Sequence, residues 1–198
     1  MKKLLFAKGR ISALAGLLFI TVLFLINGCT SSEKLLNKGQ YDFAIQKAVK
    51  KLRKNPAKTS ETLTLEKAFQ KAQQEDFDRI TFIQKEGSPD KWDEVYAIYV
   101  RIKNRQSLIK TLPTLEVRDK NKKLVRNGNF SFIDVDNEMI QSKQKAAEYF
   151  YAHGISLLQK GGRFNARDAH KELQQVKSYY GNFKDIDCLL YTSDAADE

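Results

Sequence analysis

Apolar residues recur every three or four positions through most of the chain, which is the spacing of one face of an α-helix. The pattern is clear from 41 to 54, and Pro56 follows as a helix-stop signal. The apolar positions of this stripe are Ala44, Ile45, Ala48, Val49 and Leu52. Similar stripes predict further helices over 59–85, 92–112, 140–158 and 166–180. The chain has only 10 Gly and 3 Pro, and this composition also favours helices over a turn-rich β architecture.

Between 114 and 136 the pattern changes to an alternation that is typical of strands. It covers 115–117 and 130–135, on either side of a basic centre at 119–129. We expect a small β-hairpin or an ordered loop here, inserted between pairs of helices. Loops on rigid scaffolds often carry specificity, so the cations of this insert form a candidate interaction surface. They are Lys120, Lys122, Lys123 and Arg126.

A short signature recurs where three of the predicted helices begin. The three copies are Gly39-Gln40-Tyr41-Asp42, Asp90-Lys91-Trp92-Asp93 and Gly162-Arg163-Phe164-Asn165. In each copy a small or capping residue turns the chain, and we expect the aromatic residue two positions later to fill the space between two helices. Asp90 is also suited to cap the helix that follows it. The intervals between the aromatic residues are unequal, so any array of repeats is degenerate.

The first copy carries a resemblance to a known family. Gly39, Tyr41 and Ala44, followed by Leu52 and Pro56, resemble the second half of a tetratricopeptide repeat. The resemblance covers one repeat and implies antiparallel helical hairpins stacked as a degenerate array over 35–187. The fold class we expect is therefore all-α, with a small loop or β-hairpin insert near 114–136.

The N-terminus has the pattern of a bacterial secretion signal. Lys2 and Lys3 precede an apolar run at 11–26, which is shorter than the ~20 residues that a membrane-spanning helix needs. Ile26-Asn27-Gly28-Cys29 then resembles the lipobox of bacterial lipoproteins. The resemblance implies cleavage of 1–28 between Gly28 and Cys29, lipidation of the Cys29 thiol, and a tether at 29–34. The whole chain is similar to the helical-repeat lipoproteins of Bacteroidota.

The C-terminus resembles a different kind of sequence. Residues 188–198 resemble a translated sequencing adapter. We therefore expect this tail to be non-native and the natural protein to continue past 187. Without Cys188, the remaining cysteine is Cys29, which lipidation consumes, so no disulfide or cysteine-based site is expected.

No catalytic motif is present in the sequence, and we expect neither enzyme activity nor a cofactor. His153 and His170 lie on different predicted helices, so we expect no metal site from them. An acidic group is expected on a solvated helix face, and an aromatic stripe is expected in the core, although its rings could also stack on a sugar or peptide. The acidic group is Glu75, Asp76 and Asp78, and the stripe is Trp92, Tyr96 and Tyr99.

The net charge of +10 would suggest nucleic acid in a cytoplasmic protein, but export argues against it. Next to a membrane the same charges attract anionic lipids. We expect a lipid-anchored scaffold of the cell envelope that binds another protein or peptide. Thr30 after the cysteine, where Asp would signal inner-membrane retention, favours the outer membrane. The alternatives are a glycan- or oligopeptide-binding lipoprotein of a nutrient-uptake system, and the N-terminal part of a longer envelope enzyme.

Overall fold

The described residues form helices with one small sheet. A computed structural model describes residues 31–196 of the 198-residue chain. In chain order, its elements are α2 (Ser32–Asn37), α3 (Tyr41–Lys54), α4 (Thr59–Glu86), the 3-10 helix η1 (Pro89–Lys91), α5 (Trp92–Lys110), β1 (Glu116–Arg118), β2 (Leu124–Asn127), α6 (Asp136–Lys160), α7 (Arg163–Tyr179) and α8 (Ile186–Ala195). The predicted all-α fold with a hairpin insert is confirmed.

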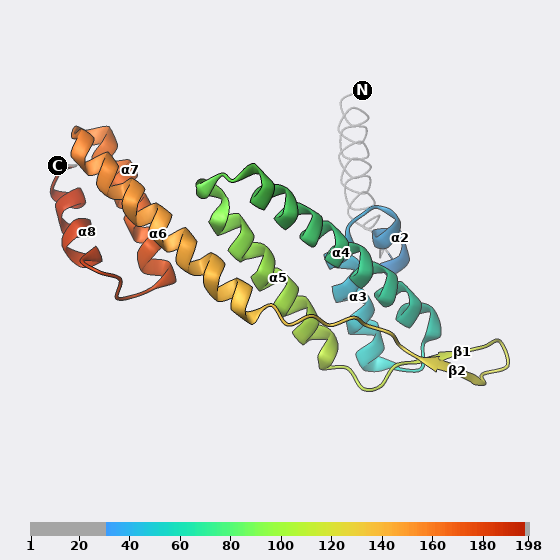
Figure 1. The fold of residues 1–198 in the computed structure, drawn as a ribbon. Helices are drawn as coiled ribbons and strands as arrows, with labels where there is room; N and C mark the ends of the chain where they lie inside the picture. The colour runs from blue at the N-terminus through green and yellow to red at the C-terminus, as the bar shows by residue number, and fades with distance from the viewer. Residues whose placement is uncertain (1–30, 197–198) are drawn as a thin grey trace, which may run out of the picture.

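The helices follow one another along an elongated molecule (Figure 1). α3 and α4 form a helical hairpin, α5 returns along α4, and α6 packs on α5 before it leads away to α7 and α8. Since α3 has 14 residues and α4 has 28, the two helices of this hairpin differ in length. Glu116–Arg118 and Leu124–Asn127 project beyond the helices at the end of the molecule that holds α3.

The core is divided into three clusters along this length. The first joins α2, α3 and the first half of α4 around Leu52. The second joins the end of α4 to α5 around Ile102. The third joins α6, α7 and α8 around Leu173. Because burying apolar area is the main stabilising term, each helical joint rests on its own local cluster.

The second strand of the insert lies earlier than the alternation predicts. β1 pairs antiparallel with β2, which falls inside the segment expected to be the basic centre. Residues 130–135 run along the helices but belong to neither strand (Figure 1). The reason is packing, because Phe130 and Phe132 place their rings against Phe69 of α4, at 5.8 and 5.7 Å between centroids. The alternation of apolar residues in this segment is therefore due to packing against α4 and not to pairing in a sheet.

The predicted tether at 29–34 is too long. α2 begins at Ser32, and Ser31 caps it by accepting a hydrogen bond from the Lys34 backbone N–H at 3.1 Å. Ser32 is itself buried and donates a hydrogen bond to Glu61 of α4. The boundary expected at 187/188 falls within α8, and the foreign origin of the tail stays a prediction.

The recurring aromatic residue fills a helical joint in two of its three copies. Tyr41 and Trp92 pack against core clusters, but Phe164 is 80% exposed, so that expectation is wrong. The residue three positions after Tyr41 or Trp92 is buried, whereas Arg167, three after Phe164, is exposed. Phe164 therefore lies on the outer face of α7.

Two smaller expectations at helix starts are also wrong. Asp90 lies within η1, and no side chain caps α5, whose preceding residue is Lys91. Ile140, placed on the buried stripe of its helix, is 56% exposed. The first turns of α6 bury Ser142 and partly bury Met139 instead.

Candidate functional site

The base of the β1–β2 hairpin is fixed to α4. Arg126 binds Glu66 with both terminal nitrogens, at 2.6 and 2.8 Å, and the Asn129 backbone N–H donates to the same carboxylate at 2.7 Å. On the other strand, the Arg118 backbone N–H donates to Thr59 Oγ1 at 3.0 Å. The hydrogen bond from Arg126 lowers the pKa of Glu66 below its usual value, against the effect of burial.

The tip of the hairpin carries the predicted lysines. Asp119 closes the turn by accepting hydrogen bonds from the backbone N–H groups of Asn121 and Lys123, at 2.8 and 2.9 Å. Lys120, Lys122 and Lys123 are exposed around it. The predicted surface is therefore divided: three lysines lie together at the tip, whereas Arg126 lies at the base and is bound to Glu66.

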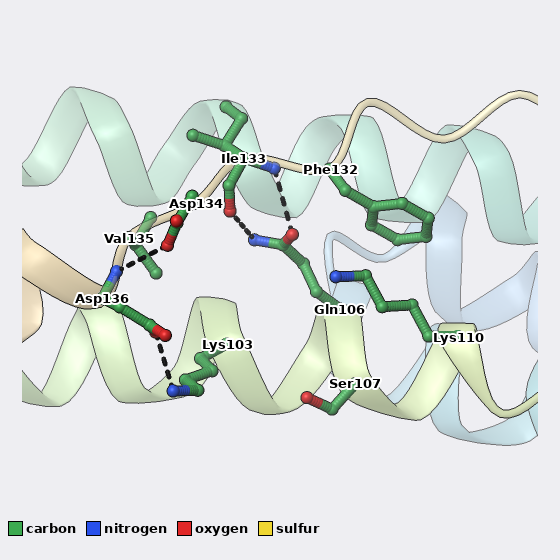
Figure 2. Close-up of a pocket in the computed structure, with 9 residues that line it drawn as sticks. All are labelled: Lys103, Gln106, Ser107, Lys110, Phe132, Ile133, Asp134, Val135 and Asp136. Carbon is green, nitrogen blue, oxygen red and sulfur yellow. Dashed lines mark hydrogen bonds and ion pairs between the residues drawn. The ribbon is translucent and has the colours of Figure 1, made fainter.

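Residues 129–135 form an extended segment that runs between α4 and α5, and Gln106 of α5 holds it in place. The Gln106 amide donates to the Ile133 carbonyl at 2.9 Å and accepts from the Ile133 N–H at 3.0 Å. Figure 2 shows this side chain reaching from α5 to both backbone atoms. Lys103 pairs with Asp136 at 2.7 Å, where α6 begins. A polar pocket of about 380 Å³ lies on this α5 side.

A larger groove of about 650 Å³ lies on the α4 side of the same segment. We call it the glutamine groove. Its walls include Gln70, Gln73 and Gln74 of α4 and Asn129, Ser131 and Ile133 of the extended segment. Gln73 Oε1 is buried and accepts no hydrogen bond from the residues that the structure describes. A buried amide oxygen without a donor costs free energy, and a rotation of the amide that turned this atom into the groove would let it accept a ligand N–H.

One residue of the acidic group that we expected on a solvated helix face lies in the core instead. Asp76 is 3% exposed and binds Arg105 Nη1 at 2.9 Å, and Arg101 contacts its other oxygen. The Arg105 Nε also binds Asp42 of α3 at 2.8 Å. This network closes the joint between α3, α4 and α5. The sequence did hold a signal, because Asp76 lies four residues after buried Ala72 and four before buried Ile80.

The remaining candidates have structural partners. His153 Nδ1 contacts the Glu172 carboxylate at 2.7 Å, and His170 Nε2 contacts the Gln174 amide at 2.7 Å, so the two histidines do not converge. Tyr99 is buried, and the Trp92 ring is covered by Lys145 at 4.0 Å. Of the predicted core stripe, Tyr99 is therefore buried, whereas Trp92 and Tyr96 are half-buried. Across residues 31–196, no cluster of three or more metal-ligating side chains was found.

Comparison of the chain with protein-family models, with curated proteins and with solved structures found no match. Within residues 31–196, no helix has both the length and the apolar character needed to cross a membrane. Gly28 and Cys29, the predicted cleavage and lipidation site, lie outside the described residues. The fold and the insert define an all-α protein in which a hairpin and the segment at 129–135 are attached to α4.

Proposed function

We propose that this protein is a lipid-anchored scaffold of the bacterial envelope, which binds an extended segment of a partner protein in the glutamine groove. The observation that carries the peptide-binding part is the row of glutamine amides along the groove, beside the chain's own 129–133 backbone, in which the Oε1 of Gln73 has no hydrogen-bond partner among the described residues. The function is binding and needs no cofactor. The lipidated Cys29 would hold the scaffold at the membrane, with the outer membrane favoured.

The chemistry of the groove suits a peptide. Each glutamine amide offers one acceptor and two donors, which match the N–H and C=O groups of a peptide backbone. Residues 129–133 form no strand, and the Phe132 N–H is bound to the Phe130 carbonyl at 3.1 Å, so a bound peptide would lie along this segment and contact mainly the glutamine amides. Gln106 and Glu66 hold this wall in place before binding, which lowers the ordering cost of association.

The start of the fold supports an anchor close to the membrane. α2 begins only three residues after Cys29, and Ser32 is held by Glu61. Lys51 Nζ also binds Glu61 at 2.6 Å. Burial alone would raise the pKa of Glu61, but the hydrogen bonds from Lys51 and Ser32 and the nearby lysine charges lower it overall. Glu61 therefore stays charged and keeps the first turn of α2 on the bundle.

The groove is tested by replacing Gln73 with an apolar residue of similar length. Peptides selected from a random library on the native protein should bind the Gln73→Met variant about tenfold more weakly, because one buried hydrogen bond is lost. Fluorescence polarisation measures this affinity. Gln141→Met, on an exposed position of α6, is the matched control and should bind as the native protein does. Equal affinity for the native and Gln73→Met chains would refute the groove as the peptide site.

The anchor is tested separately in cells fed a radioactive fatty acid. The native chain and a Cys188→Ala control should be labelled, whereas Cys29→Ala should not. The control removes the second of the two cysteines in the chain and keeps the lipobox. Equal labelling of Cys29→Ala would show that the protein is not a lipoprotein, whatever the groove binds.

A further inference from the structure

We propose that the tip of the β1–β2 hairpin is a second membrane contact, which docks on anionic lipid head groups beside the lipid anchor. The proposal rests on the lipid anchor of the proposed function and adds a site that the anchor does not require. Its occupant is an anionic membrane surface.

The tip combines free cations with exposed apolar side chains. Among the described residues, no ion pair involves Lys120, Lys122 or Lys123, whereas both arginines of the hairpin are paired with glutamates. Leu124 and Val125, next in sequence, are 48% and 64% exposed. Successive strand residues point to opposite faces, so both faces of the ribbon carry an apolar side chain at the tip.

This combination fits the interface of an anionic bilayer. Lysines are attracted to the negative surface potential, and the three of them, less the opposing charge of Asp119 in the same turn, should raise membrane partition by about thirtyfold at low salt. Aliphatic side chains beside them can enter the boundary between head groups and acyl chains. A neutral protein surface would leave the three charges unmatched. The residue types therefore favour a lipid surface.

The hairpin and the anchor also lie at the same end of α4. Ser32 is bound to Glu61, and the Arg118 backbone is bound to Thr59, two residues earlier in the first turn of that helix. The three residue steps from Cys29 to Ser32 span at most about 11 Å. A membrane that holds the lipid must therefore lie close to this end of α4. Figure 1 shows the hairpin projecting outward there, clear of the helices.

The base makes the projection rigid enough to act as a contact. Arg126 and Asn129 bind Glu66 on one side, and Thr59 holds Arg118 on the other. The tip itself makes no contribution to the helical core, since residues 119–125 are all exposed. Substitutions at the tip can therefore change membrane contact without changing the fold.

The test places a tryptophan at the tip of the full lipidated chain, reconstituted in vesicles that contain brominated phosphatidylcholine as a quencher. Val125→Trp is the probe, and Phe164→Trp, on an even more exposed position of the distant α7, is the control. Trp92, the only native tryptophan, gives a constant background measured on the native chain. Vesicles with and without phosphatidylglycerol supply the anionic and neutral surfaces.

We expect strong quenching of the tryptophan at 125 in anionic vesicles, weak quenching in neutral vesicles or high salt, and none at 164 in either. Replacing Lys120, Lys122 and Lys123 with Gln should abolish the anionic effect. Replacing Lys71, Lys85 and Lys160 with Gln, which removes the same charge from exposed helical positions, should leave it unchanged.

Two results would overturn the proposal: equal quenching at 125 and 164, or quenching at 125 that does not depend on anionic lipid, as insertion of the apolar side chains alone would produce. Failure of the anchor is distinguishable, because it appears as loss of fatty-acid label at Cys29. A labelled chain without quenching at 125 refutes the hairpin contact alone.

Discussion

Two helical joints of this molecule are closed by opposite means. Between α4 and α5 the contact includes charged side chains, with Arg105 and Asp76 only 3% and 5% exposed at the side chain. Between α6 and α7 the buried contact is made by small and aliphatic residues, and the pair of His153 with Glu172 lies at its half-exposed edge. There Leu173 lies so close to Gly154 that an added Cβ would meet its side chain at 3.0 Å.

The difference concerns how each joint fixes its alignment. An ion pair between α4 and α5 forms in one register only, and the Arg105 contact to Asp42 adds α3 to the same arrangement. The α6–α7 joint depends on close approach, because a missing side chain lets two helices come together. We therefore expect the first joint to fail when a charge loses its partner and the second to fail when volume is added.

Arg105→Met should give the largest effect. It leaves Asp76 buried with only Arg101 beside it, and the free energy of unfolding should fall by about 3 kcal/mol, the low end for breaking a buried pair. Urea denaturation followed by circular dichroism measures this. Asp76→Leu combined with Arg105→Met should recover most of the loss, because no buried charge remains. A double variant as unstable as the single one would show that the charges themselves stabilise the joint.

The apolar joint should respond to Gly154→Val. The added branches collide with Leu173, and we expect a loss of about 2 kcal/mol by the same denaturation measurement. Ala152→Val, on an exposed position of the same helix, is the control and should cost only the difference in helix propensity. If Leu173→Ala in the Gly154→Val background restores no stability, the close approach is not what closes this joint.

The charged joint between α4 and α5 was partly predictable from the spacing of the sequence. The stripes predicted the helices, and Asp76 and Arg105 occupy core positions on their stripes, with Arg105 between buried Ile102 and Ile109. A charge at a core position on each of two adjacent helices is a readable signal for a buried pair. That Arg105 also reaches Asp42 is not readable, because it depends on where α3 lies.

The insert was less predictable for a physical reason. The alternation from Phe130 to Val135 was visible, but packing on Phe69 and the hydrogen bonds of Gln106 give it an extended path without a strand partner. Gln70, Gln73 and Gln74 look like an ordinary polar helix face. They become a groove only because the extended segment passes beside them, and no local pattern encodes that crossing.

Gln106→Leu tests a contact that is held by uncharged hydrogen bonds. Such a contact is intermediate between the charged α4–α5 joint and the apolar α6–α7 joint. The substitution removes both hydrogen bonds to Ile133, and Ile133 is 41% exposed, so its backbone can turn partly to water. We expect a loss of about 1 kcal/mol. Hydrogen exchange of the Ile133 amide should accelerate, whereas Ser107→Ala, on the neighbouring exposed position, should leave it unchanged. Unaltered exchange in Gln106→Leu would mean that the segment is held by its aromatic contacts alone.

The smallest effect is expected at the partly exposed pair between Glu66 and Arg126, which shows what a charge contributes outside the core. The hydrogen bond from Arg126 holds the pKa of Glu66 below the ordinary value of a glutamate, so the pair stabilises the folded state at pH values above that ordinary pKa. The contribution should disappear as the pH falls through the lower folded pKa. The difference in Tm between the native chain and Glu66→Gln should accordingly be small at pH 7 and should shrink as the pH is lowered further into the acid range. Glu61 titrates in both chains, so its effect cancels in the difference. A Tm difference that stays constant as the pH falls would show that Glu66 acts through packing and not through its charge. The charge of a carboxylate would then matter for stability at the buried Asp76 but not at the partly exposed Glu66.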